Sequence, residues 1–395
     1  MTILSNKINL ETSFPNFNRK LRLGIIGGGR IAEMQSMAAR MTNRWDIVAG
    51  ALSSDPKKNI LLSNKWFLNS ERVYSSYKEM AISETKRQDC VDAVMITTPN
   101  HLHLDCCKEF IEAGISIMCD KPLTNTVSDA QQLKAHLKDF KGTFGVGYVM
   151  SCFPMVRQAK ELISLGEIGA INQIHVEFFQ DWMVTSELSD EPHVKWRLDP
   201  DKSGNTSCVG DIGTHACHLA QFVSGLSLTE LRADFHVCGH PKTLEDTAFM
   251  SLKFENGIPG TLMVTRVASG NRGGLRLRIY GSKGGIEWDL EKCDFLRLNL
   301  HGKPDQVISR GHGHGISKTT QRLIRSSRGF PEGIIEAWGN LYTELAIAIA
   351  AQKDETALPD HLLQFPDFEE GFNGVKFNQA AYTSSINNGK WISIE

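Results

Sequence analysis

The sequence predicts an α/β protein: a doubly wound parallel sheet followed by a second α/β region with a large, mostly antiparallel sheet. Strands alternate with helices up to about residue 146, which is typical of a parallel sheet with right-handed crossovers. A glycine-rich turn joins the first strand to the first helix. Beyond about residue 147, successive strands are separated by tight turns, and this pattern predicts antiparallel pairing. We therefore expect an arm at 1–20 and domains at 21–146 and 147–395.

The first region consists of short apolar runs separated by amphipathic segments. Apolar runs bounded by turn residues predict buried strands, whereas apolar residues three and four apart predict helices. The expected strands cover residues 21–27, 46–52, 92–97, 115–118 and 143–146, and the expected helices run from the glycine turn through residue 40, over 104–113 and over 128–137.

The second region begins with a helix over 155–165 and an alternating strand over 171–179. A helix is expected over 207–222, with Gly225 placed to end it. Asn256-Gly257 and residues 281–284 mark turns between strands. The further strands are expected over 231–237, 246–254, 260–266, 276–280 and 285–289, a loop over 310–315, and closing helices over 332–351 and 369–385.

Composition limits the possible partners and location. The net charge is -2, with 41% hydrophobic and 22% charged residues, which argues against nucleic acid as the main partner. No apolar run is long enough to span a membrane. The polar first twenty residues lack the apolar core of a signal peptide and are expected to form a flexible arm. The nine irregularly spaced cysteines give no metal template and predict reduced thiols in the cytoplasm.

The glycine turn indicates a dinucleotide site. Gly27-x-Gly29-x-x-Ala32 follows a strand and opens a helix, which is the context that gives this short motif its meaning. Gly27 permits the tight turn, Gly29 lets the backbone approach a pyrophosphate, and Ala32 allows close helix–strand packing. The helix N-terminus, with Arg30 and Ile31, offers free N–H groups to the phosphates.

The residues after the second strand leave the choice between NAD and NADP open. Ser53-Ser54-Asp55 stands where a ribose-binding acid is usual. If Ser53 takes the place of the acid, no carboxylate repels a 2′-phosphate, and Lys57 and Lys58 are near enough to help bind one. Asp55 could instead reach the ribose.

Lys121 is a candidate for holding the reacting oxygen. Asp120-Lys121-Pro122 directly follows a strand, at the sheet edge where ligands bind in open parallel sheets. The proline restricts Lys121 to extended backbone and aims its side chain at the crevice. A solvated surface lysine is the alternative.

Asp211 and His215 are a candidate acid–base pair. Their spacing would place both side chains on one face of a helix, where the carboxylate would orient and tune the imidazole. A helix cap and a core histidine are the alternative interpretation. Together with His218 the pair also resembles a metal site, but no metal is expected, because the ligands would lie in one helical row and Lys121 already supplies an electrophile.

Two further groups lie near the expected site. Thr98, Pro99, Asn100 and His103 follow the third strand and are expected beside the cofactor or substrate, although His103 could equally be structural. The aromatic residues Trp182 and Trp196, with Arg197, could form a platform for a sugar, and packing alone is as good an explanation.

The chain resembles the Gfo/Idh/MocA family, named for glucose–fructose oxidoreductase and inositol dehydrogenase, over roughly residues 20 to 390. Residues 51–56 and 331–333 resemble a branch acting on sugars, cyclitols or glycosides. The resemblance rests on Gly27-x-Gly29-x-x-Ala32, on residues 98–103, on Cys119-Asp120-Lys121-Pro122-Leu123, a variant of the family's Glu-Lys-Pro, and on residues 210–215.

This resemblance implies an N-terminal Rossmann domain and a C-terminal substrate domain whose open sheet builds homo-oligomers, dimers or tetramers. It also implies that the final helix packs back on the Rossmann domain, and that Lys121, Asp211 and His215 are the catalytic set. Two departures fall near the implied substrate pocket: Phe330 precedes Pro-Glu-Gly, and Val149-Met150 replaces a polar-aromatic pair.

The sequence thus predicts an NAD- or NADP-dependent dehydrogenase that oxidises a secondary hydroxyl of a sugar, cyclitol or glycoside. In this hypothesis His215, oriented by Asp211, removes the hydroxyl proton while Lys121 stabilises the oxyanion. One alternative is an enzyme that recycles bound cofactor to isomerise a sugar or cleave a glycoside. The other is a non-catalytic NAD(P)-sensing regulator.

Overall fold

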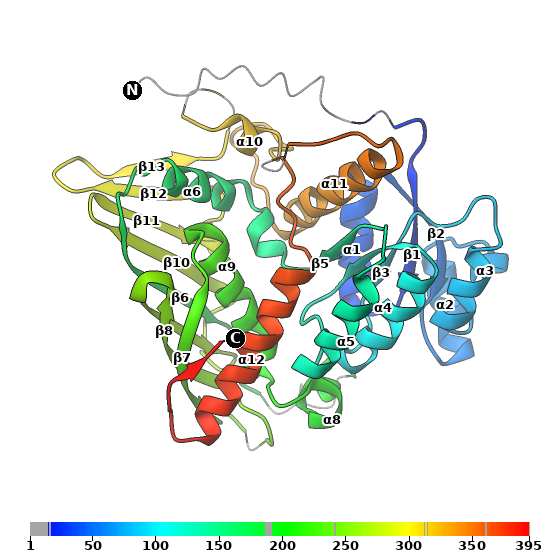
Figure 1. The fold of residues 1–395 in the computed structure, drawn as a ribbon, viewed down its shortest axis with the longest axis horizontal. Helices are drawn as coiled ribbons and strands as arrows, with labels where there is room; N and C mark the ends of the chain where they lie inside the picture. Colours follow the sequence, from blue (N-terminus) through cyan, green and yellow to red (C-terminus); the bar gives the residue numbers. More distant parts are fainter. Residues whose placement is uncertain are drawn as a thin grey trace.

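A computed structural model describes residue 15 and residues 17–185, 192–240, 242–311, 313, 315–359 and 362–394. Two sheets lie side by side with helices between them (Figure 1). The expected arm falls mainly outside the described residues, as do His312 and His314 of the expected loop. Among the residues described, no helix is both long and apolar enough to cross a bilayer.

The first sheet is parallel throughout and has five strands in the order β2-β1-β3-β4-β5. Because β1 lies between β2 and β3, the chain reverses direction across the sheet at this point, which is where such sheets bind ligands. The strands are β1 (Leu21–Ile26), β2 (Trp45–Ala51), β3 (Ala93–Ile96), β4 (Ser116–Cys119) and β5 (Phe144–Val146).

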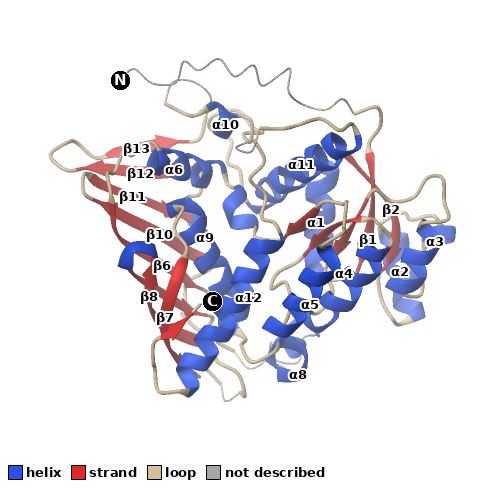
Figure 2. Cartoon of the chain, viewed as in Figure 1, coloured by secondary structure: helices blue, strands red, loops and turns tan. Residues whose placement is uncertain are grey.

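The helices of this half follow the predicted alternation, so the predicted doubly wound sheet is confirmed. Figure 2 shows them flanking the strands. They are α1 (Arg30–Met41), α2 (Pro56–Lys65), α3 (Tyr77–Glu84), α4 (His103–Glu112) and α5 (Val127–Leu137). The helices α2 and α3 were not predicted, because the apolar periodicity of their segments is weak.

The second sheet has nine strands in the order β13-β12-β11-β10-β6-β9-β8-β7-β14. All its neighbours pair antiparallel except β6 and β9, which run parallel. The strands are β6 (Ile171–Phe179), β7 (Leu228–His236), β8 (Thr247–Phe254), β9 (Pro259–Thr265), β10 (Gly274–Gly281), β11 (Gly284–Asp289), β12 (Phe295–Leu300), β13 (Gln306–Ser309) and β14 (Ile392–Ser393). The edge strands β13 and β14 and the neighbouring strand β12 were not predicted.

One face of this sheet is covered by α6 (Pro154–Ser164), α9 (Thr214–Ser224) and α12 (Phe368–Ile386) (Figure 1). The helix α12 also contacts α5 and β5 of the first half. A further helix, α11 (Ile334–Lys353), packs on α1, and Trp45 donates its indole N–H to the carbonyl of Tyr342 at 2.9 Å. One continuous hydrophobic core therefore joins the two sheets.

The structure differs from the helix predicted over residues 207–222 in the first part of that range. Residues Val209–Gly213 form a π-helical turn, in which the N–H of Thr214 donates to the carbonyl of Val209 five residues earlier. The regular helix α9 begins only at Thr214 and ends, as predicted, at Gly225, whose φ is 72°. Asp211 lies in this wider turn, whereas His215 lies in α9.

Candidate active site

The glycine turn between β1 and α1 is shaped to admit a dinucleotide. Gly27 has a φ of +90°, and a Cβ there would lie 3.0 Å from the carbonyl oxygen of Thr97. At Gly29 a Cβ would meet nothing within 4 Å, so open space lies before the helix N-terminus. Ala32 is fully buried against the sheet. The open space at Gly29 and the uncapped first turn of α1 fit a pyrophosphate.

The backbone after β2 is fixed by Asn59, a residue that was not predicted from the sequence. Asn59 accepts hydrogen bonds from the N–H groups of Leu52 at 2.9 Å and Ser53 at 3.3 Å. The exposed Asp55 caps α2, its Oδ1 accepting from the N–H groups of residues 57 and 58 at 2.8 and 3.1 Å. Its second oxygen remains for a ligand, so this segment still leaves NAD and NADP open.

His103 joins the loops that follow β3 and β4. Its Nδ1 lies 3.0 Å from the carbonyl oxygen of Pro122, and its Nε2 lies 2.9 Å from that of Thr98. Both ring nitrogens are therefore engaged by backbone, which favours the structural alternative for His103. Asn100, at the start of the short 3₁₀ turn before α4, is also buried.

Lys121 and Asp211 meet across the two halves of the molecule. Lys121 follows β4 of the parallel sheet, while Asp211 belongs to the π-helical turn packed on the other sheet. The ammonium donates to Oδ1 of Asp211 at 2.6 Å and to its backbone carbonyl at 2.8 Å. The two side chains are only 12% and 19% exposed, so water screens this pair weakly.

Two arginines complete the surroundings of Asp211. Nε of Arg197 lies 3.7 Å from its Oδ2, and Nη1 of the fully buried Arg266 lies 3.9 Å away. Burial alone would raise the pKa of Asp211, but Lys121, Arg197 and Arg266 hold it well below its ordinary value. Asp211 is therefore a carboxylate throughout the physiological pH range.

No hydrogen bond joins Asp211 to Nδ1 of His215 in this structure, so the contact expected from their spacing is not observed. The carboxylate of Asp211 is taken up by Lys121 and the arginines, and Nδ1 of His215 is buried without a hydrogen-bond partner. Burial and the nearby Lys121 ammonium hold the pKa of His215 well below its ordinary value, against the carboxylate of Asp211. The imidazole is therefore neutral and able to accept a proton.

The aromatic residues predicted as a platform lie near this carboxylate. The guanidinium of Arg266 lies over the ring of Trp182 at 5.3 Å, and the indole N–H of Trp182 donates to Gln180 at 2.8 Å. The guanidinium of Arg197 lies over the ring of Trp196 at 4.5 Å. Both indoles are thus linked through an arginine to Asp211.

The residues that depart from the family pattern occupy different environments. Val149 and Met150 are buried in the hydrophobic core, at 3% and 7% exposure. Phe330 is 68% exposed, and its carbonyl oxygen accepts from Ser326 at 2.9 Å.

Glu245, which was not predicted from the sequence, anchors the π-helical turn. Both oxygens of the buried Glu245 accept from the N–H of Ser207, at 2.8 and 3.0 Å, and Oε1 also accepts from Val209 at 2.9 Å. Burial raises the pKa of Glu245 to about 7, against these N–H groups and Arg266. An acid directly before a predicted strand was the available signal, but its partners lie far away in the sequence.

Known proteins share both halves of this arrangement. Residues 21–148 match the model of an oxidoreductase family with an NAD-binding Rossmann fold, and residues 156–287 match that of the GFO/IDH/MocA C-terminal domain. The oxidoreductase YfiI of Bacillus subtilis is 31% identical over 388 residues, which cover 96% of this chain and 98% of YfiI. The chain belongs to the Gfo/Idh/MocA family.

Members of the Gfo/Idh/MocA family with stated ligands or substrates are also similar over nearly their whole length. An inositol dehydrogenase homologue from Azotobacter vinelandii, complexed with NADH and myo-inositol, superposes with a TM-score of 0.88 at 28% identity, covering 95% of this chain and 98% of that one. Levoglucosan dehydrogenase of Pseudarthrobacter phenanthrenivorans is 25% identical over 408 residues, covering 95% of this chain and 98% of the relative. This Gfo/Idh/MocA chain is therefore an NAD(P)-binding oxidoreductase of the sugar and inositol dehydrogenase type.

Proposed function

We propose that this protein oxidises a secondary hydroxyl of a sugar, cyclitol or glycoside by hydride transfer to NAD or NADP. The observation that carries the proposal is the Lys121 ammonium, held 2.6 Å from Asp211 between the two halves and beside a neutral His215. An electrophile and a base at the carboxyl end of a parallel sheet suit the oxidation of an alcohol.

In this proposal the proton of the substrate hydroxyl passes to His215. Nδ1 of His215 is buried without a partner, which leaves Nε2 to take the hydroxyl proton. The Lys121 ammonium donates to the developing oxyanion, and Asp211 holds that ammonium in place. Asp211 thus acts on Lys121 instead of on His215, which revises the role predicted from spacing.

The cofactor, when bound, supplies the hydride acceptor. The residues that would hold it are the turn and first helical residues Gly27, Gly29, Arg30, Ile31 and Ala32, the segment Ser53, Ser54 and Asp55, and the loop residues Thr98, Pro99 and Asn100, with His103 supporting that loop. The domain boundaries at 146 and 147 follow from this assignment, with the cofactor on the first side and the substrate mainly on the second.

The substrate side is formed by Trp182, Trp196 and Arg197 together with the catalytic groups. Aromatic faces next to charged hydrogen-bonding groups suit sugar rings, which present C–H faces and hydroxyl edges. The relatives support this class, since one is a levoglucosan dehydrogenase and another was crystallised with myo-inositol.

A substrate panel tests this function. Purified protein is assayed with cyclitols, aldoses and glycosides, each with NAD and with NADP, while nicotinamide absorbance and product are followed together. Net NADH or NADPH formation supports a dehydrogenase. Product without net reduced cofactor identifies the recycling alternative. Tight cofactor binding without any product across the panel contradicts catalysis and favours the regulator.

Assembly and location complete the proposal. The outer face of the nine-stranded sheet exposes Phe249 and Phe295, each at 48%, and Val307 at 62%, and an apolar surface of this kind suits a homo-oligomer.

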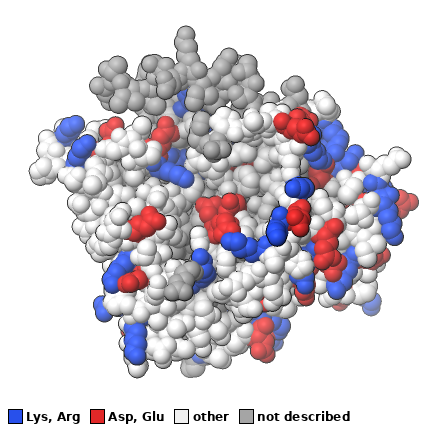
Figure 3. Space-filling view, in the orientation of Figure 1, with Lys and Arg blue, Asp and Glu red and all other residues white. Residues whose placement is uncertain are grey.

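All nine cysteines are unpaired, which supports a reducing compartment, the cytoplasm. On the face drawn in Figure 3 acidic and basic side chains are interspersed, as expected for a protein that does not bind nucleic acid there.

A further inference from the structure

The buried Nδ1 of His215 has no hydrogen-bond partner. The imidazole instead contacts an aromatic ring, that of Tyr148. The ring of Tyr148 stands almost perpendicular to the imidazole, at 83°, with the ring centroids 5.8 Å apart. Tyr148 is fully buried and follows β5, so it reaches His215 from the parallel sheet side.

Tyr148 is in turn fixed at its hydroxyl and at its ring face. Its hydroxyl lies 2.6 Å from Oγ1 of Thr214, the residue before His215. His218 stacks on the tyrosine ring with an interplanar angle of 7° and a centroid distance of 4.3 Å. These contacts confine the ring of Tyr148, and the imidazole of His215 packs edge-on against that confined ring.

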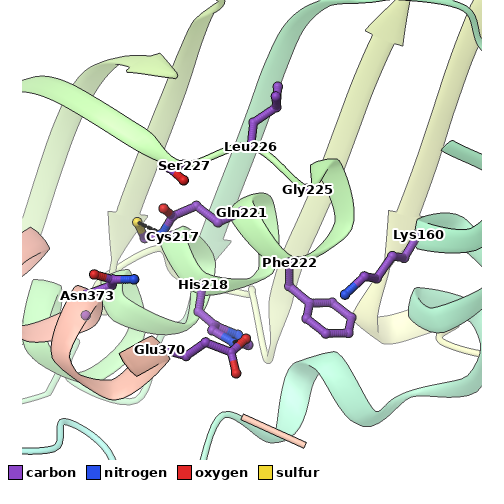
Figure 4. Close-up of a pocket in the computed structure, with 11 residues that line it drawn as sticks. Lys160, Cys217, His218, Gln221, Phe222, Gly225, Leu226, Ser227, Glu370 and Asn373 are labelled. Carbon is purple, nitrogen blue, oxygen red and sulfur yellow. Dashed lines mark hydrogen bonds and ion pairs between the residues drawn. The ribbon is translucent and has the colours of Figure 1, made fainter. Parts of the chain in front are cut away.

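The far end of the stack is anchored on α12. Nε2 of His218 lies 3.1 Å from Oε1 of Glu370 (Figure 4). The other oxygen of Glu370 accepts from the N–H of Asp367 at 3.0 Å, which closes the capping box of α12. The stack of Glu370, His218 and Tyr148 therefore runs from a helix end to His215.

We propose that Tyr148, backed by His218 and Glu370, is the positioning residue of His215 and takes the part that spacing had assigned to Asp211. The inference rests on the proposed function, since it concerns the orientation of the proposed base. A misplacement of about 1 Å at a reacting group costs up to about a hundredfold in rate. The proton-transfer step is thus the step that this stack controls.

The stack borders a pocket that makes the inference testable by chemical rescue. The pocket has a volume of about 230 Å³ and lies between α6, α9 and α12 (Figure 4). His218 lines it together with Lys160, Gln221, Phe222, Glu370 and Asn373. Truncation of His218 would therefore open a ring-sized space that added imidazole reaches from solvent.

The main experiment compares Tyr148→Leu with Tyr148→Phe in the intact protein. We expect Tyr148→Leu to lower kcat at least about tenfold and to raise the solvent deuterium isotope effect on kcat, because proton transfer is the step that slows, with KM for NAD(P) unchanged. Tyr148→Phe, which retains the ring, should keep kcat within about threefold of the original value. Tyr74→Leu is the matched control, since Tyr74 is another buried tyrosine with its hydroxyl bonded, to Glu84 at 2.7 Å.

A double-mutant cycle with His215→Ala shows through which residue Tyr148 acts. If Tyr148 acts through His215, Tyr148→Leu has no further effect on kcat once His215 is alanine. An equal loss in both backgrounds, or a loss in Tyr74→Leu as large as in Tyr148→Leu, overturns the inference. A near-normal kcat in His215→Ala alone instead overturns the proposed function.

His218→Ala provides the test if Tyr148→Leu does not fold. Its kcat should fall several-fold, by less than that of Tyr148→Leu, because Tyr148 keeps its Thr214 contact. Added imidazole should restore kcat in this variant and leave the original protein unchanged. An unaltered kcat in a folded His218→Ala protein overturns the role of the stack.

Discussion

Lys121 connects the two halves of the site through one side chain. Its ammonium donates twice to Asp211, and its charge also lowers the pKa of His215. In the proposed function the same residue therefore supplies the electrophile and keeps the neighbouring base, His215, neutral.

Removal of either reacting group should stop the chemistry while cofactor binding survives. We expect Lys121→Ala and His215→Ala each to lower kcat by about a hundredfold or more, because neither side chain lies at the glycine turn. Steady-state kinetics and NAD(P) titration by fluorescence measure the two effects. Near-normal turnover in both variants would contradict the assignment.

The pH profile should report the coupling of His215 to Lys121. A base whose pKa is lowered stays unprotonated, and therefore active, at pH values below the ordinary histidine range. We expect kcat/KM of the original protein to stay level as the pH falls through 6.5. Lys121→Ala removes the positive charge that lowers the pKa of His215. The residual kcat/KM of this variant should therefore begin to decline at a higher pH as the solution is made more acidic. An unmoved decline would mean that Lys121 does not influence the base.

At the scale of elements, α9 and α12 approach closely around the Tyr148 hydroxyl. Gly374 of α12 lies at this contact, where a Cβ would come within 1.9 Å of the Tyr148 hydroxyl and 2.8 Å of Oγ1 of Thr214. The close approach depends on the absence of a side chain at that position.

Gly374→Ala should therefore lower both activity and stability, although alanine is the better helix former by about 1 kcal/mol. The added methyl group must displace Tyr148 or separate the two helices. Tyr148→Phe in the same chain removes the nearest atom and should recover part of the lost melting temperature and kcat. Gly371→Ala, one turn earlier on α12, tests the same change at a site where the nearest contacts are aliphatic side chains at 2.9 and 3.1 Å. Equal effects at the two positions would argue against a specific role for the hydroxyl contact.

At the scale of the molecule, the nine-stranded sheet is covered by helices on one face and exposes aromatic residues on the other. Phe249 of β8 points outward, because its neighbours Ala248 and Met250 are buried. This open face is a candidate subunit interface.

Phe249→Asp should shift the protein toward the monomer, because a buried unpaired carboxylate is costly at an apolar interface. Light scattering coupled to size-exclusion chromatography measures the mass of both proteins. Ile60→Asp, at a 58% exposed position on α2, is the control for a surface charge placed elsewhere. An unchanged oligomer in Phe249→Asp would exclude this face as the interface.

Local sequence determined the alternation of strands and helices, the glycine turn at Gly27 and Gly29, and the position of Lys121 at the end of β4. Each of these depends on residues that are neighbours in the chain. The end of α9 at Gly225 was predictable for the same reason.

Only the tertiary structure decided how Asp211 is used. Its partner Lys121 lies ninety positions earlier in the chain, and Glu245 anchors the π-helical turn in which Asp211 lies. The proposed support for His215 likewise involves other parts of the chain, through Tyr148 after β5 and Glu370 of α12, together with His218 of its own helix. Spacing predicts which residues share a helix face, but it cannot show which distant charge or ring will occupy that face when the two sheets come together.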